Sequence, residues 1–344
     1  MHPRDALLGV RRSRGLLPVC DHYSGVEARM VKSLQLQAEM REEFGLSVFD
    51  VTLDCEDGAP VGGEREHAQM VCDLVVRAGQ RLGATQAAGR SRVGVRVHSV
   101  DHDAFESDVE VIVGRSSSLL SYVMVPKVET LADVQRAVDA IDAATSVQHP
   151  NRLPVHVLIE SPLAVFNAVD IAAHPRVESL SFGLMDFVSS HGGAIPASAM
   201  TSADSDGRRG FNQFTHPVVA RAKLEVASAC HIHGKVPSHC VVTEFKALAD
   251  LESQARLAAD GFSYTRMWSI HPAQIRPILR AFAPRQHEVD MAVRVIPLAQ
   301  KNDWAPIAIN GTLHDRASYR LFWSVLERAA LTGMDLPSEI KEYL

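Results

Sequence analysis

The sequence lacks long apolar runs, a disulfide pattern and an excess of basic residues. No uninterrupted run of about 18 apolar residues occurs, so no membrane-spanning helix and no membrane partner are expected. The five cysteines are odd in number and scattered, which is typical of reduced thiols. With a net charge of -6, a nucleic-acid partner is not expected either. The segment Met1 to Arg14 is too charged for a signal peptide, which indicates a cytoplasmic protein.

Two nucleotide-binding motifs are also absent. No predicted strand leads into a Gly-x-Gly-x-x-Gly turn, and no phosphate loop with Gly-Lys-Ser/Thr occurs. These absences count against the dinucleotide-binding version of an open, doubly wound sheet.

The chain has 344 residues, 46% of them hydrophobic, and short apolar runs alternate with segments of helical period. The predicted strands are Gly15–Cys20, Ser47–Leu53, Arg92–His98, Ser121–Pro126, Leu153–Glu160, Val177–Gly183, Gly234–His239 and Phe262–Ile270. Such alternation predicts an α/β fold with parallel strands. A count of eight favours a (β/α)₈ TIM barrel, although an open doubly wound sheet would give the same local signals.

The pattern of elements also predicts how the chain is divided. Residues 1–284 would form the barrel, with an inserted loop over residues 191–214 that is rich in Gly, Ser, Ala and Asp. Residues 285–344 would form a C-terminal lid extension. It would contain a helix over His287–Gln300, a hairpin within Asn302–Thr312 and a helix over Asp315–Leu331.

Acidic and basic residues gather at the predicted carboxyl ends of the strands, where barrel enzymes have their active sites. They include Glu56 and Asp57 after the second strand, Arg96 near the end of the third, and Lys127, Glu160 and Asp186 after the next three. Several carboxylates in one desolvated mouth repel one another unless a cation is bound. Mg²⁺ typically takes one or two carboxylates, so the adjacent-strand pair Glu160 and Asp186 is the predicted ligand set. For any one of these acids, an ion pair or a helix cap is an alternative.

Six motifs occur in a characteristic order. They are Leu53-Asp54-Cys55-Glu56-Asp57-Gly58, Arg96-Val97-His98, Val125-Pro126-Lys127-Val128-Glu129, Leu158-Ile159-Glu160-Ser161, Phe182-Gly183-Leu184-Met185-Asp186 and Ile270-His271-Pro272-Ala273-Gln274. Together they resemble the citrate lyase β-subunit and malyl-CoA lyase family, within the HpcH/HpaI aldolase superfamily. The resemblance covers about residues 11–330. It implies a TIM barrel, a Mg²⁺ cofactor and a carbon–carbon lyase that works by retro-Claisen or aldol cleavage.

The resemblance also implies roles for individual residues. Glu160 and Asp186 match the metal ligands, and Arg96 matches the arginine that stabilises the enolate oxygen of a thioester. Glu56 and Asp57 match an acidic pair that supports metal-bound water, and Lys127 matches the lysine that orients them. The substrate would be a CoA thioester of the malyl or citramalyl type, and the second product a 2-oxo acid such as glyoxylate or pyruvate.

The C-terminal lid of the family supplies an aspartate, commonly to the site of a neighbouring subunit. Asp315 occupies that place here and is the predicted acid/base at the methyl carbon, unless it is only the N-cap of the last helix. The resemblance also suggests a homotrimer, or a hexamer made from trimers.

The chain departs from the family on the side that would bind CoA. A Val-Pro-Gly turn after the first strand is missing, and the Gly-Lys that often precedes Ile270-His271 is replaced. Arg14 and Arg266 are the predicted substrate or CoA contacts instead.

Three other functions remain open. One is a Mg²⁺-dependent aldolase that acts on free 4-hydroxy-2-oxo acids, which the missing turn favours. The second is a catalytically silent binding protein on the same barrel. The third, a zinc site, would use Cys230, His231, His233, His239 and Cys240, but no CxxC knuckle supports it.

Overall fold

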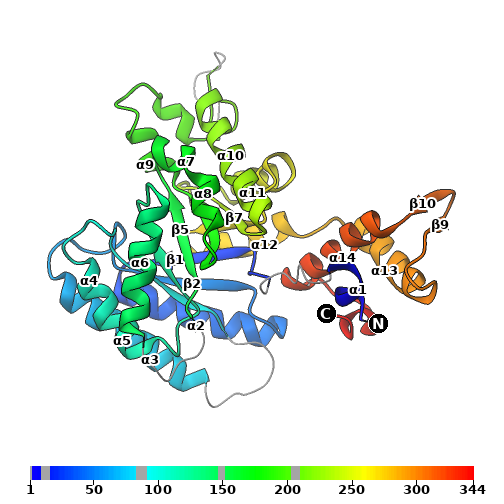
Figure 1. Cartoon of the computed structure of the whole chain (residues 1–344), viewed down its shortest axis with the longest axis horizontal. Coiled ribbons are helices and arrows are strands. Elements are labelled where there is room, and N and C mark those ends of the chain that lie inside the picture. The colour runs from blue at the N-terminus through cyan, green and yellow to red at the C-terminus, as the bar shows by residue number, and fades with distance from the viewer. Residues whose placement is uncertain (1, 9–15, 83–90, 146–151, 203–209) are drawn as a thin grey trace.

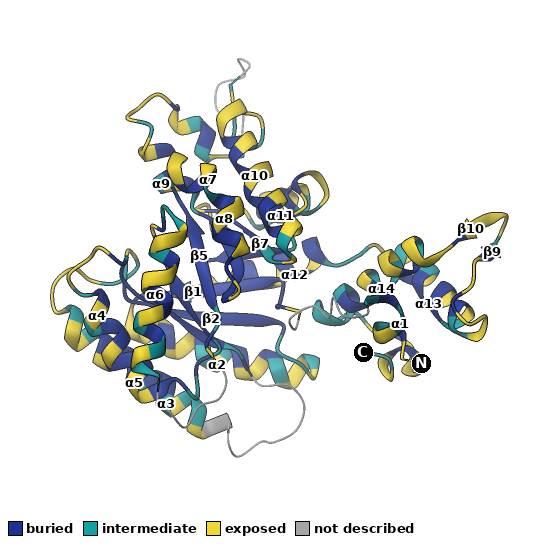
Figure 2. Ribbon diagram, viewed as in Figure 1, coloured by how far each residue is buried: buried dark blue, intermediate teal, exposed yellow. Residues whose placement is uncertain are grey.

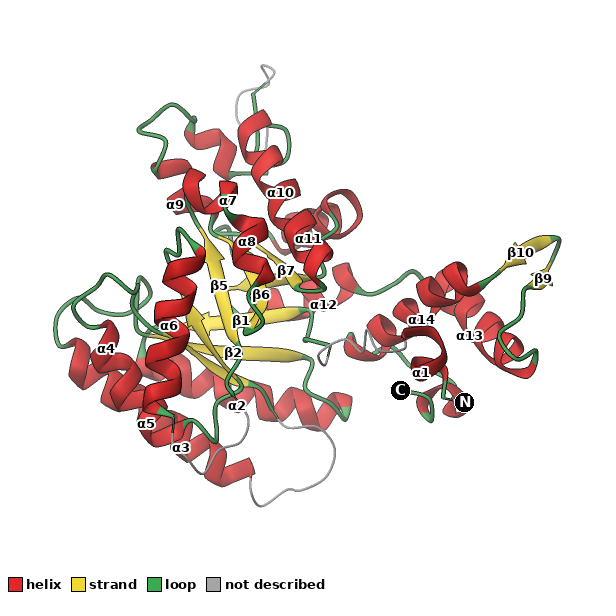
Figure 3. Ribbon diagram, viewed as in Figure 1, coloured by secondary structure: helices red, strands yellow, loops and turns green. Residues whose placement is uncertain are grey.

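Eight parallel strands form a closed barrel in chain order, with β8 paired back to β1 (Figure 3). The computed structural model describes residues 2–8, 16–82, 91–145, 152–202 and 210–344. The barrel strands are β1 (Cys20–Ser24), β2 (Phe49–Asp54), β3 (Val93–Arg96), β4 (Tyr122–Val125), β5 (Val155–Ile159), β6 (Val177–Phe182), β7 (Val236–His239) and β8 (Arg266–Ser269). The predicted (β/α)₈ barrel is confirmed, and the open sheet is excluded.

Helices surround the barrel on its outside (Figure 1). They are α2 (Glu27–Phe44), α3 (Glu64–Leu82), α4 (Phe105–Asp108), the π-helix η1 (Val109–Val113), α5 (Gly114–Ser116), α6 (Leu131–Ala144), α7 (Pro162–Phe166), α8 (Ala168–Ala173), α9 (Leu184–Ser189), the 3₁₀-helix η2 (Ala197–Met200), α10 (Pro217–His233), α11 (Leu248–Phe262) and α12 (Pro272–Phe282). Strands are buried along their length, while the helices expose their outer faces (Figure 2). The main hydrophobic core therefore lies between strands and helices.

Local signals explain where the helices begin and end. Thr130 caps α6, since its hydroxyl accepts from the backbone N–H of Asp133 and the Asp133 carboxylate accepts in return. Helix α2 ends at Gly45, whose φ of 71° is the left-handed conformation that favours glycine.

The interior of the barrel contains buried charges. The Arg266 guanidinium on β8 contacts Asp50 of β2 at 2.7 Å and Asp21 of β1 at 3.0 Å. Near the amino ends of the strands, Arg92 contacts Glu178 at 2.9 Å. The first strand was predicted at Gly15–Cys20, but β1 runs over Cys20–Ser24. The prediction was wrong because the strand carries the buried polar residue Asp21.

A C-terminal appendage with its own core lies beside the barrel (Figure 1). Its elements are α13 (Gln286–Lys301), the antiparallel hairpin of β9 (Ile307–Ile309) and β10 (Thr312–His314), α14 (Arg316–Leu331) and α15 (Ser338–Lys341). Helix α1 (Pro3–Leu8) joins the same core through Leu7, although the sequence had assigned it to the barrel. The hairpin projects from the appendage away from the barrel (Figure 1).

None of the helices in the described ranges combines the length and the apolar character that a membrane crossing requires.

Candidate active site

A buried ion pair fixes Arg96 at the carboxyl end of the barrel. Arg96 on β3 and Asp54 on β2 are direct neighbours in the parallel register. The Nε and Nη2 atoms of Arg96 each lie 2.6 Å from a carboxylate oxygen of Asp54. Burial lowers the pKa of Arg96, but the Asp54 carboxylate outweighs burial and the net shift is upward. The guanidinium is therefore a permanent positive charge with one orientation.

The loop after β2 folds back on Asp54 and places the next acid beside Arg96. The backbone N–H groups of Glu56 and Gly58 donate to the Asp54 carboxylate at 3.0 and 2.8 Å. A Cβ at position 58 would lie 2.3 Å from an Asp54 oxygen, so only glycine fits there. Glu56 in turn lies 3.1 Å from Nη1 of Arg96.

Lys127 connects the second strand to the fifth. Its ammonium contacts the Glu56 carboxylate and lies 3.3 Å from Asp57, while its backbone N–H donates to Glu160 at 2.9 Å. The φ of 52° places Lys127 in the left-handed region, which is costly for a residue with a side chain and is common at functional sites. This backbone conformation lets one residue orient acids from two different strands.

Glu160 is a buried carboxyl group that faces a second acid. Burial, followed by the charge of Asp186, raises the pKa of Glu160 to about 8. The side chain packs over Gly183, where a Cβ would lie 2.4 Å from Cγ of Glu160. The Gly183 of the fifth motif is thus explained by the close approach of Glu160. Two acids in this position repel each other, and a cation between them would remove the repulsion.

Two aromatic rings border the Arg96 guanidinium. Its central carbon lies 5.2 Å from the Tyr23 ring centroid and 5.7 Å from that of Trp268, and the rings are 5.0 Å apart. Trp268 is buried, and its indole N–H has no hydrogen-bond partner among the described residues. The rings form an apolar wall beside the charged groups.

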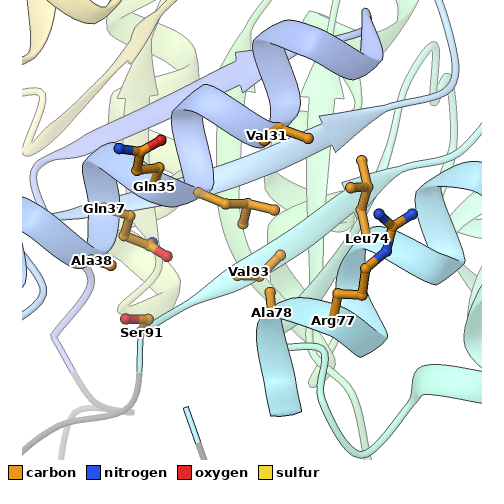
Figure 4. Close-up of a pocket in the computed structure, with 10 residues that line it drawn as sticks. Val31, Gln35, Gln37, Ala38, Leu74, Arg77, Ala78, Ser91 and Val93 are labelled. Atoms are coloured by element: carbon orange, nitrogen blue, oxygen red, sulfur yellow. The ribbon is translucent and has the colours of Figure 1, made fainter. Parts of the chain in front are cut away.

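A cavity of about 670 Å³ adjoins this aromatic wall. Tyr23 lines it, together with Gly58, Phe245 and two basic residues of α2, Arg29 and Lys32. A smaller cavity of about 190 Å³ lies on the outer wall between α2 and α3 (Figure 4). The only charged group among its lining residues is Arg77, so it lacks the acids that the active-site chemistry needs.

The structure brings five predicted residues into one network: Glu56, Asp57, Arg96, Lys127 and Glu160. Asp186 is linked to this network because its charge raises the pKa of Glu160. In the described parts of the chain, no group of three or more His, Cys, Asp or Glu side chains could hold a metal. A cation at Glu160 and Asp186 would therefore complete its coordination with water or substrate oxygens.

Two predicted residues lie away from this network, and a third lies outside the described residues. Arg266 is fully buried between Asp50 and Asp21, so the prediction that it contacts substrate or CoA is corrected to a role inside the barrel. Arg14, and residues 203–209 of the predicted loop, lie outside the described residues. Asp315 is exposed on the appendage, where its carboxylate accepts from the backbone N–H of Ala317 at 2.9 Å as the N-cap of α14.

Sequence reasoning missed Asp54 and Tyr23, which lie beside Arg96. It also missed the two basic residues of the cavity of about 670 Å³. Asp54 could have been found, because it ends the strand next to the one that carries Arg96. Tyr23 could not, since the first strand was misplaced. Arg29 and Lys32 looked like an ordinary solvated helix face.

A closed parallel barrel with a network of acids and a fixed arginine at its carboxyl edge defines the class of (β/α)₈-barrel enzymes. Residues 33–201 match the family described as HpcH/HpaI aldolase/citrate lyase. A crystal structure of a citrate lyase from Burkholderia xenovorans LB400 is 43% identical, covers 100% of both chains and has a TM-score of 0.81. The chain belongs to the HpcH/HpaI aldolase/citrate lyase family, a family of carbon–carbon lyases.

Two further similarities concern more distant proteins. An L-malyl-CoA/β-methylmalyl-CoA lyase from Cereibacter sphaeroides is 28% identical over 215 residues. That alignment covers 60% of this chain and 66% of the relative, just under two thirds of its length. The protein CitE from Mycobacterium tuberculosis, solved with magnesium, acetoacetate and coenzyme A, is 20% identical. The superposition covers 91% of this chain and 98% of CitE, and its TM-score of 0.64 shows that the two proteins share the fold.

Proposed function

We propose that the protein is a Mg²⁺-dependent lyase that cleaves a 3-hydroxyacyl-CoA thioester of the malyl or citramalyl type. The products are an acyl-CoA and a 2-oxo acid such as glyoxylate or pyruvate. The observation that carries the proposal is the buried Glu160 beside Asp186, in the same network as the fixed cation Arg96.

The chemistry of the donor set fits Mg²⁺. Glu160 and Asp186 are oxygen ligands, and their mutual repulsion is the condition that a hard divalent cation relieves. When bound there, Mg²⁺ supplies Lewis-acid polarisation of the carbonyl of the 2-oxo acid. Lys127 holds Glu160 through its backbone N–H, and its ammonium keeps Glu56 and Asp57 at the same edge. The magnesium in the M. tuberculosis protein of the same fold supports this assignment.

Arg96 is suited to stabilise the enolate of the departing acyl thioester. A guanidinium has five N–H groups, and the contacts to Asp54 and Glu56 use three of them. The other two have no further described protein partner and can donate to an oxygen that gains negative charge. Because Asp54 fixes the guanidinium beforehand, no reorganisation is needed when the charge develops.

The large cavity provides a place for the CoA part of the substrate. It begins at Tyr23, next to Arg96, and reaches Arg29 and Lys32, whose cations can pair with phosphate oxygens. The malyl-CoA lyase from C. sphaeroides supports a CoA thioester as substrate. Arg29 and Lys32 replace Arg266 among the CoA contacts that we propose, and Arg14 remains a proposed contact.

The acid that protonates the enolate carbon is Asp315 of a neighbouring subunit in a trimer or hexamer. Asp315 begins α14 on the appendage, which lies beside the barrel and has its own core (Figure 1), so we assign it to the site of a neighbouring subunit. The appendage exposes Leu313 and Leu321, and α7, directly after Glu160, exposes Leu163 and Phe166. Apolar patches of this kind favour contact between subunits.

Two alternatives predict different substrates. A free-acid aldolase would not need the cavity with Arg29 and Lys32, and a silent binding protein would not need Asp54 to fix Arg96. We expect purified protein with Mg²⁺ to release a 2-oxo acid from malyl-CoA or citramalyl-CoA, detected by reduction with a coupled dehydrogenase. EDTA is expected to stop the release. Cleavage of free 4-hydroxy-2-oxo acids alone would establish the aldolase, and the absence of any turnover would favour the binding protein.

Hybrid oligomers test whether Asp315 acts across a subunit boundary. We expect the Asp315→Asn and Glu160→Ala variants to be inactive alone and to regain activity when they are co-expressed, because mixed oligomers contain sites with both wild-type residues. Asparagine is also a good N-cap, so the helix that follows keeps its start. The measurement is turnover by hybrids purified through two different tags. A hybrid as inactive as its parents would contradict the exchange.

A further inference from the structure

A second, smaller cavity lies behind the acids of the active site. Its volume is about 250 Å³, and Glu56, Asp57 and Lys127 form the wall that it shares with the active site. His98, His102 and Glu64 line the other side. Val61 at its rim is fully exposed, so the cavity reaches solvent and has room for several water molecules. The proposed metal and CoA contacts make no use of it.

A buried carboxylate orients His98 in this cavity. Nδ1 of His98 lies 2.7 Å from Oδ2 of Asp108, and the backbone N–H of His98 donates to the same oxygen at 2.9 Å. Asp108 has no exposed surface, and its Oδ1 has no hydrogen-bond partner among the described residues. It ends α4 directly before the π-helix η1, a rare turn that often occurs at functional sites. With Nδ1 bound to Asp108, Nε2 is the free ring nitrogen of a histidine that lines the cavity.

The surroundings of His98 favour its protonated form. The hydrogen bond to Asp108 raises the pKa of His98, burial opposes this, and the charges of Asp108, Glu56 and Glu64 raise it further. Asp57 and the Lys127 ammonium also line the cavity, and they lie 3.3 Å apart, so their opposite charges compensate each other. The His102 ring stacks on His98 at 4.3 Å. A raised pKa means that His98 holds a proton at a higher pH than a free histidine does.

Cleavage of a 3-hydroxyacyl thioester moves two protons. The hydroxyl group loses its proton, and the O–H electron pair becomes the second bond of the new carbonyl. The electron pair of the broken carbon–carbon bond forms the thioester enolate, whose carbon takes a proton from the acid. The hydroxyl proton must therefore leave through a group on the side of the metal and Glu56.

We propose that the cavity is the proton port of the site and that His98, held by Asp108, takes up the hydroxyl proton through Glu56 and the cavity water. Nε2 of His98 receives the proton, the Asp108 carboxylate stabilises the imidazolium, and the proton then leaves to solvent at the rim. His98 is thus a positioning residue for proton transfer and does not touch the substrate. The inference rests on the proposed lyase function.

Kinetics of three variants test this role. His98→Asn keeps a donor for Asp108 but does not titrate, and we expect kcat to fall by roughly 10- to 100-fold with KM unchanged. Because the relay accepts a proton only when His98 is neutral, wild-type kcat should fall as the pH drops below the pKa of His98. Asp108→Asn should move this acid limb to lower pH. Ser99→Ala, in the same cavity, is the matched control and should keep wild-type kcat.

Chemical rescue separates proton transfer from a structural role. Imidazole in the buffer should restore part of the kcat of His98→Ala, because the cavity is open to solvent. In metal-free protein, NMR should show His98 titrating at higher pH than a free histidine, and Asp108→Asn should lower that pH. An unchanged kcat in His98→Asn, an equal loss in Ser99→Ala, no rescue by imidazole, or a pKa of His98 below that of a free histidine would each overturn the relay alone. Absence of thioester cleavage by the wild-type protein would overturn the proposed function and the relay with it.

Discussion

Replacement of Glu160 by glutamine is expected to lower kcat for thioester cleavage by roughly 1,000-fold or more. The variant keeps the size of the side chain and its bond to the backbone N–H of Lys127, but removes one of two proposed anionic ligands. Asp186 alone would bind Mg²⁺ weakly, and the 2-oxo acid carbonyl would lose its polarisation. The measurement is kcat over a Mg²⁺ titration, in which excess metal should not restore the wild-type rate.

A binding readout and a matched variant separate loss of the metal from loss of the fold. Mg²⁺ should raise the Tm of the wild-type protein, since a ligand that binds only the native state stabilises it, and should not raise that of Glu160→Gln. Glu129→Gln is the control, because Glu129 lies in the loop after the neighbouring strand β4 but accepts a hydrogen bond from Ser161 at 2.7 Å. It should keep both activity and the Mg²⁺ response. Wild-type turnover by Glu160→Gln would refute the ligand assignment.

The sequence predicted the elements that carry an apolar run or an apolar stripe, but it misplaced the first strand and missed the pairing of buried charges. Helix α6 was recognisable from Thr130 and its apolar stripe, and the hairpin from Asn310-Gly311. The first strand was misplaced because its residue Asp21 faces a partner more than 200 residues away in the chain. Apolar periodicity carries no information about such a pair.

The candidate site was also predicted from the sequence only in part. Acids at strand ends were visible because the carboxyl ends of parallel strands meet at one edge. The bond between Asp54 and Arg96 depends on strand register, which no local pattern reveals. Arg266 was assigned to substrate or CoA because it stands near the position where the family often has Gly-Lys before Ile270-His271, whereas the two carboxylates that bind it are remote in sequence. The role of Asp315 involves a second chain and stays a proposal.

Replacement of Arg266 by methionine is expected to destabilise the protein by about 3–5 kcal/mol. Methionine fills much of the same space but leaves two carboxylates, Asp50 and Asp21, in the barrel interior with a single cation, Arg92, which lies 3.4 Å from Asp50. Urea unfolding followed by circular dichroism measures the loss. Arg276→Met is the matched control, because Arg276 pairs with Glu43 on the exposed surface, where ion pairs contribute little.

Two further measurements distinguish a buried structural role of Arg266 from a contact with CoA. They are the stability of a double variant and the KM for the CoA thioester. Adding Asp50→Asn to Arg266→Met should recover part of the lost stability, since it removes one of the two carboxylate charges. In the fraction that folds, the KM should match that of the wild type, because Arg266 has no exposed surface with which to contact substrate. A raised KM in a variant of wild-type stability would instead return Arg266 to the CoA site.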